Sequence, residues 1–183
     1  MTNDLGYHTF MQRRPRIGIA MRIDHSTERF YLARHYSEAV EAAGGAPLHI
    51  SLIPNAEYIN AVVDGLDGIL LPGSNSDVDP LRYGQQPHLA LGEVHTLKDE
   101  TDLLIINAAE RRQLPIFAIC FGMQVLNVSR GGTLIQDIAS QVPGAIKHEQ
   151  GVPRDRASHS AKVSADSKLN EIIKTEDLLI NSH

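Results

Sequence analysis

The segment 114–130 constrains the fold more than any other part of the sequence. An apolar run, Leu114–Ile119, leads directly into Cys120, Phe121 and Gly122, and an amphipathic stretch follows. We expect a buried strand that turns sharply into a helix over about 123–130, with the side chain of Cys120 presented at the turn. Glycine at position 122 allows a tight turn without a clashing side chain. Such a turn is typical of the carboxyl edge of a parallel sheet.

The rest of the chain alternates apolar runs with helical patterns. We expect strands at 16–21, 46–51 and 67–71, and helices at 28–43, 55–63 and 98–112. This alternation with short turns predicts an α/β fold, a doubly wound, mostly parallel sheet flanked by helices as in flavodoxin. Two late extended segments, near 161–163 and 178–180, flank a short helix at 169–174 and are expected to add antiparallel edge strands.

Composition excludes several classes of protein. The single cysteine rules out an internal disulfide framework and favours a reducing cytoplasm. The net charge of −5 comes from interspersed acids and bases, so no basic face argues for nucleic acid. No apolar run is long enough to cross a membrane, and no histidine pair has metal-ligand spacing, so we expect neither metal nor cofactor. Residues 1–15 are expected to form a disordered lead without signal-peptide character.

Cys120 is the candidate nucleophile. A helix N-terminus favours the thiolate, and the backbone N–H of Phe121 is placed to stabilise an oxyanion. A lone cysteine is more often a small buried hydrophobe, but its position between strand and helix favours the reactive interpretation. Gly73, at the end of the strand at 67–71, is a second candidate donor, because loops at the carboxyl ends of strands gather around one crevice. Taken alone, the turn at Pro72–Ser74 only indicates a chain reversal.

An ordered set of segments resembles the class I glutamine amidotransferase-like superfamily. The resemblance is closest to its γ-glutamyl hydrolase branch, the peptidase C26 group that includes γ-glutamyl-γ-aminobutyrate hydrolase. It is carried by Gly44-Gly-Ala-Pro47, Asp67-Gly-Ile-Leu-Leu-Pro-Gly-Ser74, Asp77-Val78 with Pro80 and Tyr83-Gly84, Pro115–Gln124, Leu126-Asn-Val128 with Gly131–Asp137, His148, Ser158-His159 and Asn181-Ser182.

The resemblance implies hydrolysis of γ-glutamyl amides of small molecules. Cys120 would attack the side-chain carbonyl and form a γ-glutamyl thioester that water resolves, with Gly73 and Phe121 supplying oxyanion N–H groups. The substrate-binding positions that it implies are Ser74, Gln124, His159, Asn181 and Ser182. For Gln124 a purely structural role is equally open. The leaving amine stays open among polyamine-derived, folate-like and simple glutamine substrates.

Three departures from the family pattern qualify that expectation. Phe121 stands where the branch more often has arginine, which bears on substrate more than on chemistry. The helix start at 98–102 matches the branch only loosely. The family's general base is a histidine in a late Q-W-H-P-E-like segment, whereas this sequence has no tryptophan and no His-Pro pair. We therefore expect a single domain over 16–183 that lacks its C-terminal part.

Three functions stay open on these residues. The first is an active hydrolase whose printed sequence is incomplete. The second is an inactive remnant that binds γ-glutamyl compounds. The third is a glutaminase subunit that feeds ammonia to a synthetase partner, which the stand-alone pattern at 77–84 disfavours. The oligomeric state is not readable from the sequence, and a homo-oligomer is among the alternatives.

Overall fold

The computed structural model describes residues 13–151, 153 and 155–182. Their contacts fall into two compact units, a first unit that extends to Asp137 and a second unit over Ile138–His183. The predicted N-terminal lead lies mostly outside the described residues. Of its described part, Arg13 forms an ion pair with Asp67 and Arg14 forms one with Glu41.

A four-stranded parallel sheet organises the first unit. Its strands are β1 (Arg16–Ala20), β4 (Ala46–Ile50), β5 (Gly68–Leu71) and β6 (Ile116–Ala118), in the order β4-β1-β5-β6. Every neighbouring pair in this sheet is parallel. The α/β fold class expected from the sequence is therefore confirmed.

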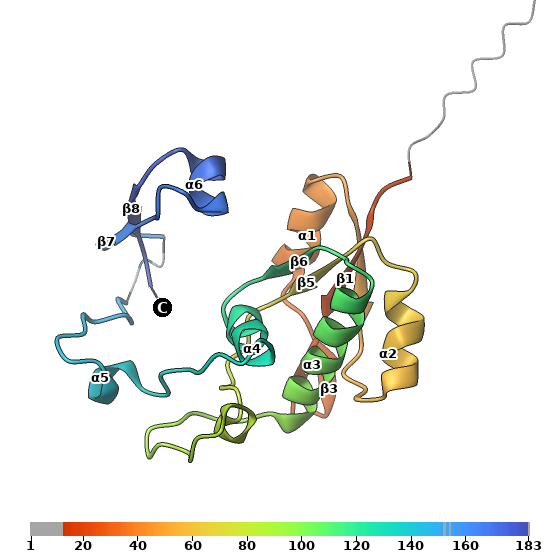
Figure 1. Ribbon diagram of the computed structural model, residues 1–183, viewed down its shortest axis with the longest axis horizontal. Coiled ribbons are helices and arrows are strands. Elements are labelled where there is room, and N and C mark those ends of the chain that lie inside the picture. The colour runs from red at the N-terminus through yellow and green to blue at the C-terminus, as the bar shows by residue number, and fades with distance from the viewer. Residues whose placement is uncertain (1–12, 152, 154, 183) are drawn as a thin grey trace, which may run out of the picture. The chain divides into compact units, whose positions relative to one another are not determined.

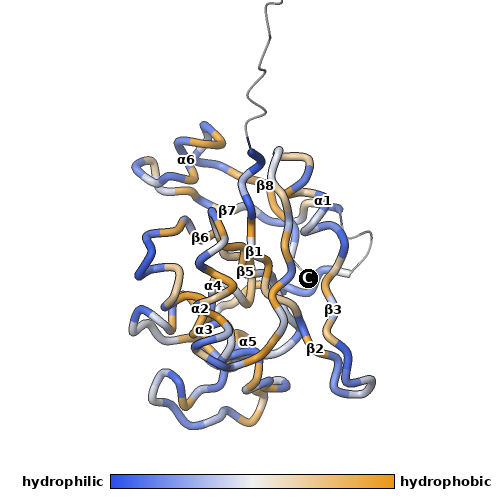
Figure 2. Tube along the Cα trace, turned by 90° about the vertical axis from the view of Figure 1, so that its right-hand side faces the viewer, coloured by the Kyte–Doolittle hydropathy of each residue, from blue (hydrophilic) through white to orange (hydrophobic). Residues whose placement is uncertain are grey.

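Helices cover both faces of this sheet (Figure 1). They are α1 (Arg34–Ala42), α2 (Ala56–Val63), α3 (Thr96–Arg111) and α4 (Phe121–Ser129). Side chains alternate between the faces of β5, so Leu70 packs in one core cluster with Val40 of α1, whereas Ile69 and Leu71 pack in the other with α2, α3 and α4. Figure 2 shows hydrophobic colouring gathered along β1 and β5.

A small hairpin follows β1 and was not expected. Strands β2 (Arg22–Asp24) and β3 (Arg29–Tyr31) pair antiparallel, and the turn between them is coloured hydrophilic in Figure 2. The helix predicted over 28–43 therefore begins only at Arg34. Glu28 has a left-handed backbone with φ 52°, which a helix interior excludes.

The long connection between β5 and α3 contains a short helix that a side-chain N-cap stabilises. It holds the 3₁₀ helix η1 (Pro80–Tyr83), whose N-cap Asp79 accepts a hydrogen bond from the backbone N–H of Leu81. A backbone bridge also joins Asp77 to Val94 across the connection. The loop at the carboxyl end of β5 therefore returns close to its own start before α3 begins.

The second unit contains short elements. They are α5 (Ile138–Gln141), β7 (His159–Lys162), α6 (Lys168–Ile173) and β8 (Asp177–Ile180). The predicted late strands are present, and they pair antiparallel with each other from His159 opposite Ile180 to Lys162 opposite Asp177. None of the described side chains of this unit is fully buried.

No helix among the described residues combines the length and the apolar character that crossing a membrane requires. In the same part of the chain, no three histidine, cysteine, aspartate or glutamate side chains gather as a metal-binding group.

Candidate active site

Cys120 lies on a strained turn between β6 and α4. It is the N-cap of α4 with φ 53° and ψ −116°, and it is exposed. α4 begins at Phe121, two residues earlier than the sequence pattern predicts. A backbone in this sparsely populated region costs about 1–3 kcal/mol and is typical of functional positions. The strand–turn–helix arrangement expected at Cys120 is therefore present.

Gly122 makes this turn sterically accessible. A Cβ at this position would lie 2.3 Å from the carbonyl oxygen of Leu71 and 2.6 Å from the Leu71 Cβ. Because the obstacle includes backbone of β5, no rotation of a side chain relieves it. The turn that carries Cys120 therefore requires glycine two residues later.

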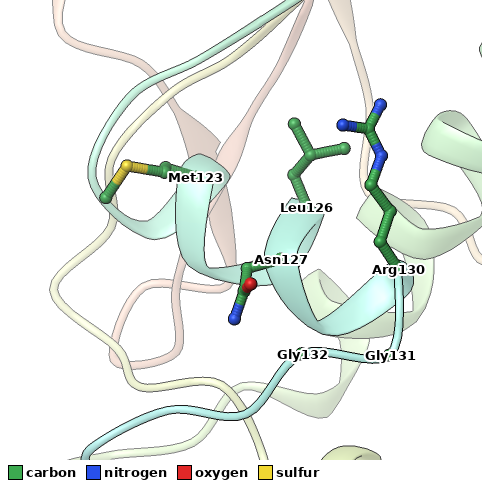
Figure 3. Close-up of a pocket in the computed structure, with 6 residues that line it drawn as sticks. All are labelled: Met123, Leu126, Asn127, Arg130, Gly131 and Gly132. Carbon is green, nitrogen blue, oxygen red and sulfur yellow. The ribbon is translucent and has the colours of Figure 1, made fainter. Parts of the chain in front are cut away.

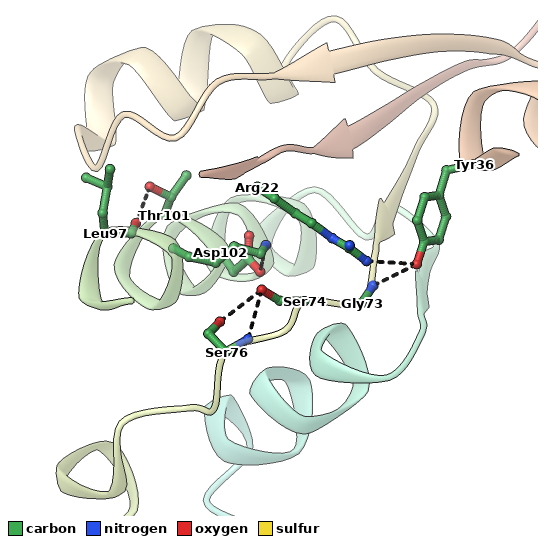
Figure 4. A network of polar contacts seen from close by, with 9 residues as sticks. Arg22, Tyr36, Gly73, Ser74, Ser76, Leu97, Thr101 and Asp102 are labelled. Carbon is green, nitrogen blue, oxygen red and sulfur yellow. Dashed lines mark hydrogen bonds and ion pairs between the residues drawn. The ribbon is translucent and has the colours of Figure 1, made fainter. Parts of the chain in front are cut away.

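The backbone of Gly73 lies against Cys120. A Cβ at Gly73 would be 3.2 Å from the Cys120 Cβ and 3.3 Å from the Tyr36 hydroxyl oxygen. The N–H of Gly73 donates to that hydroxyl at 3.1 Å, and Arg22 Nη2 donates to it at 3.3 Å (Figure 4). The structure thus brings Gly73, Cys120 and Phe121 together, as expected, and adds Tyr36 and Arg22.

The Tyr36 hydroxyl retains a proton to donate. A phenol oxygen that accepts two hydrogen bonds still carries its own O–H. The Arg22 guanidinium also lies 5.8 Å from the centroid of the Tyr36 ring, and its Nε is buried with no hydrogen-bond partner among the residues that the structure describes. No local motif in the sequence marks either residue. Arg22 could have been suggested only by its position in the fold, because it closely follows β1 at the carboxyl edge of the sheet.

The side chain of Phe121 points into the core. It has no exposed surface, and the Nζ atom of Lys98 lies 5.2 Å from the centroid of its ring. The aromatic ring therefore belongs to the hydrophobic core. The contribution of Phe121 at the turn is through the backbone N–H, which as the first in the helix has no intrahelical acceptor.

A fully buried ion pair lies beneath this turn. Lys98 Nζ is 2.6 Å from Asp102 Oδ2, and neither side chain has any exposed surface. Burial raises the pKa of Asp102, and the attraction of Lys98 opposes that rise. The second carboxylate oxygen of Asp102 has no partner among the described atoms. Lys98 and Asp102, near the start of α3, are thus part of the protein interior.

Asp99 anchors the loop that follows β5. Its Oδ2 accepts the backbone N–H of Asp79 at 2.9 Å, and its side chain is fully buried. Burial raises the pKa of Asp99 to about 6, against the lowering effect of the Asp79 N–H. The start of α3 and the loop at 77–84 are therefore joined through one buried carboxyl group.

Two other predicted positions of the first unit have local partners. The Ser74 hydroxyl lies 2.9 Å from the Ser76 hydroxyl and accepts the Ser76 N–H at 3.4 Å (Figure 4). Gln124 lines a small cavity of about 20 Å³ together with Asp77 and Tyr83, on the loop that follows β5. This placement favours the packing role that the sequence left open for Gln124.

The remaining predicted positions belong to the second unit. Gln150 Nε2 lies 2.8 Å from His159 Nδ1, and Gln150 Oε1 accepts the N–H of Ser182 at 3.2 Å. The Ser182 hydroxyl lies 3.4 Å from both His148 Nδ1 and His159 Nε2. His159 and Ser182 therefore share one polar network, next to Asn181, and Gln150 at its centre was not foreseen.

A cavity of about 460 Å³ on α4 is separate from this site. Figure 3 shows its lining by Met123, Leu126, Asn127 and Arg130, with Gly131 and Gly132 closing the end of the helix. Cys120 does not line it.

The chain is similar to a described protein family and to several known proteins. A family model described as Peptidase C26 matches residues 15–183. Protein NtpR of Enterococcus hirae is 32% identical over 177 residues, which cover 92% of this chain and 73% of that protein. A protein of Rickettsia prowazekii named as glutamine amidotransferase-like is 33% identical over 147 residues, covering 75% and 50%.

A relative with a named reaction also matches. The γ-glutamyl-γ-aminobutyrate hydrolase of Escherichia coli O157:H7 is 36% identical over 172 residues, which cover 87% of this chain and 65% of the enzyme. The chain thus spans about two thirds of that relative and half of the Rickettsia protein. With the family model covering nearly all of the sequence, the chain belongs to the peptidase C26 family.

Proposed function

We propose that this chain is a cysteine-dependent hydrolase of γ-glutamyl amide bonds that acts through a γ-glutamyl thioester on Cys120. The observation that carries the proposal is the exposed, strained cysteine at the N-terminus of α4 with the backbone of Gly73 packed against it. Nucleophile and oxyanion donors then share one small region, which acyl transfer requires. The relative named as a γ-glutamyl-γ-aminobutyrate hydrolase supports the substrate class.

In the acylation step, the Cys120 thiolate attacks the γ-carbonyl carbon and the carbonyl oxygen becomes an oxyanion. The Phe121 N–H at the helix N-terminus stabilises that charge. A second donor comes from Gly73 or from Tyr36, because the Gly73 N–H already donates to the Tyr36 hydroxyl, which has its own proton to give. The C–N bond then breaks, and the amine departs with a proton.

In the second step, water attacks the thioester, releases glutamate and restores the thiol. The family resemblance assigns the proton transfers to a histidine in a late segment that the printed sequence does not contain. An alternative function is the binding of γ-glutamyl compounds without turnover. Acylation of Cys120 separates the two, since a binding protein has no need of a reactive thiol.

The test is covalent labelling with a γ-glutamyl chloromethyl ketone, followed by intact-mass measurement. We expect one adduct on the wild-type chain and none on Cys120→Ser. The α-glutamyl isomer and iodoacetamide serve as controls for recognition and for thiol accessibility. A chain that reacts with iodoacetamide at Cys120 but ignores the γ-glutamyl reagent would contradict the proposal. Tyr36→Phe distinguishes the two candidate donors: labelling by the γ-glutamyl reagent should slow, relative to iodoacetamide, if Tyr36 is the second donor, and should not slow if it is Gly73, whose N–H the variant releases.

A further inference from the structure

A cavity of about 360 Å³ opens between the β2–β3 hairpin and the loop that follows β5. Asp24, His25 and Tyr31 line it from the hairpin, and Asn75, Glu93 and His95 line it from the loop. The two segments leave the carboxyl ends of β1 and β5, and Cys120 follows β6 at the same edge of the sheet. In open α/β sheets this edge is where ligands bind.

One residue of the cavity lining, Asn75, is close in sequence to Gly73 of the candidate site. Asn75 is two residues after Gly73, and a Cβ at Gly73 would lie 3.2 Å from the Cys120 Cβ. A substrate whose carbonyl carbon reaches Cys120 can therefore extend its leaving side along Ser74 and Asn75 into the cavity. A volume of this size is in the range of small-molecule sites.

The charge of the lining is one-sided. Asp24 and Glu93 supply two carboxylates, and none of the described residues that line the cavity is lysine or arginine. The two arginines of the hairpin, Arg22 and Arg29, are not part of the lining, and Arg22 faces the Tyr36 hydroxyl. Asp24 accepts hydrogen bonds from the Ser26 hydroxyl at 2.6 Å and the Ser26 N–H at 2.9 Å. These bonds lower the pKa of Asp24, so its carboxylate stays ionised.

The remaining lining offers ring faces. The His25 and His95 rings lie 4.4 Å apart between centroids, and His95 Nε2 is 3.7 Å from a Glu93 carboxylate oxygen. Tyr31 is half exposed at the hairpin side. Carboxylates in the same lining as the Tyr31 ring favour an alkylammonium group, which gains from both the charges and that ring.

We infer that this cavity is the subsite for the leaving amine and that it takes a leaving group bearing a second ammonium, as in a diamine or polyamine. The inference rests on the proposed function. It predicts a preference for a cationic leaving group. The leaving group named for the Escherichia coli relative, γ-aminobutyrate, carries a carboxylate instead.

Three γ-glutamyl amides of equal length test this inference. Their leaving amines are 1,4-diaminobutane, n-butylamine and 4-aminobutanoate, so only the terminal group changes from cationic to neutral to anionic. Binding is measured by titration calorimetry on the Cys120→Ser chain at about pH 8, where an ordinary imidazole is neutral. We expect the diamine amide to bind about tenfold more tightly than the aminobutanoate amide, the scale of one or two partly exposed ion pairs.

The double variant Asp24→Asn, Glu93→Gln locates the effect. It should bring the diamine amide to the affinity of the butylamide, because the new asparagine side chain keeps an acceptor oxygen for Ser26 while the charge is gone. The control Asp64→Asn, Glu110→Gln removes the same charge at the far ends of α2 and α3 and should leave the preference intact. Equal binding of all three amides, a preference for the aminobutanoate amide, or no binding would overturn the subsite. Labelling of Cys120 by the γ-glutamyl reagent would still stand, so the two failures are distinguishable.

Discussion

Each of the two compact units is stabilised internally by a different kind of interaction. All the buried hydrophobic side chains of the described chain lie in the first unit, from Ile19 to Val128. The described part of the second unit has no buried side chain. Polar contacts instead join Gln150 to His159 and Ser182. Candidate site residues occur in both units: Gly73 and Cys120 in the first, His159 and Ser182 in the second.

This difference separates two ways of fixing a functional group. Cys120 is positioned by close packing, because β5 and α4 meet at a contact with no spare volume. His159 and Ser182 are positioned by hydrogen bonds that water can replace. A substitution that disturbs the packing should therefore lower both the global stability and the reactivity of Cys120. A substitution in the polar network should affect only its immediate surroundings.

The largest effect is expected from Lys98→Met. It leaves the carboxylate of Asp102 buried without its ion-pair partner, which costs about 3–5 kcal/mol in the free energy of unfolding. Urea unfolding measures the loss. The double variant Lys98→Met, Asp102→Leu should recover most of it, because the buried charge is gone. A loss below about 1 kcal/mol in the single variant would mean that the pair is not buried as described.

Gly122→Ala should come next. The added methyl group meets the Leu71 carbonyl, and overpacking of this kind costs about 1–3 kcal/mol. Labelling of Cys120 by the γ-glutamyl reagent should fall by more than the stability loss explains, because the turn is displaced. Gly65→Ala is the matched control, since the nearest atom to its added Cβ is 3.7 Å away. Unchanged labelling in Gly122→Ala would contradict the contact.

A pH effect should follow from Asp99. Its pKa in the folded chain is about 6, above the ordinary 3.8, so between these values the folded state holds more protons than the unfolded state. Stability from this group therefore falls as pH rises from about 4 to about 6. Asp99→Asn should remove that fall, and urea unfolding across this window measures it.

A control of opposite sign is available for the pH effect. Arg13 and the Arg16 N–H lower the pKa of Asp67, so its contribution is present above about pH 4 and fades as pH falls. Asp67→Asn should therefore lower stability by a constant amount above about pH 4, and this loss should shrink as pH falls below 4. If Asp99→Asn and the wild type keep a constant difference from pH 4 to pH 6, the assignment to Asp99 is wrong.

The smallest effect is expected from Gln150→Ala in the second unit. It removes the contacts to His159 and Ser182 but opens no core, so unfolding of the first unit should change by less than about 1 kcal/mol. Amide hydrogen exchange at Ser182 should speed up, while exchange in β5 should not. Faster exchange in β5 as well would show that the polar network supports the packed unit after all.

The parallel sheet and the turn at Cys120 could be predicted because their signals are local. An apolar run, a cysteine and a glycine in sequence are enough to define a strand that turns into a helix. The β2–β3 hairpin could not be predicted, because the segment after it has a helical pattern. The left-handed residue in its turn is Glu28, and a glutamate gives no sequence signal for that backbone conformation. The start of the predicted helix was therefore placed too early.

The surroundings of the nucleophile were less readable for a related reason. Tyr36 meets Gly73 across 37 positions of sequence, and no pattern within either segment records that contact. The cavity beside Asn75 depends likewise on His25 and His95, two histidines without motif context that meet only in the folded chain. A candidate residue that lies on a single turn can be predicted from the sequence, whereas a pocket that is lined by several separate loops cannot.

The contact between Gly122 and Leu71 has a consequence for how such a site can diversify. Cys120 and Gly73 are both positioned relative to the same end of β5, so their mutual spacing depends on one backbone contact and not on the loops around them. The hairpin and the loop before α3 can then change length or composition while the reacting groups keep their separation. Under the proposed function, substrate choice and bond cleavage therefore depend on separate parts of the chain, and a new leaving group can be accommodated without a change at Cys120 or Gly73.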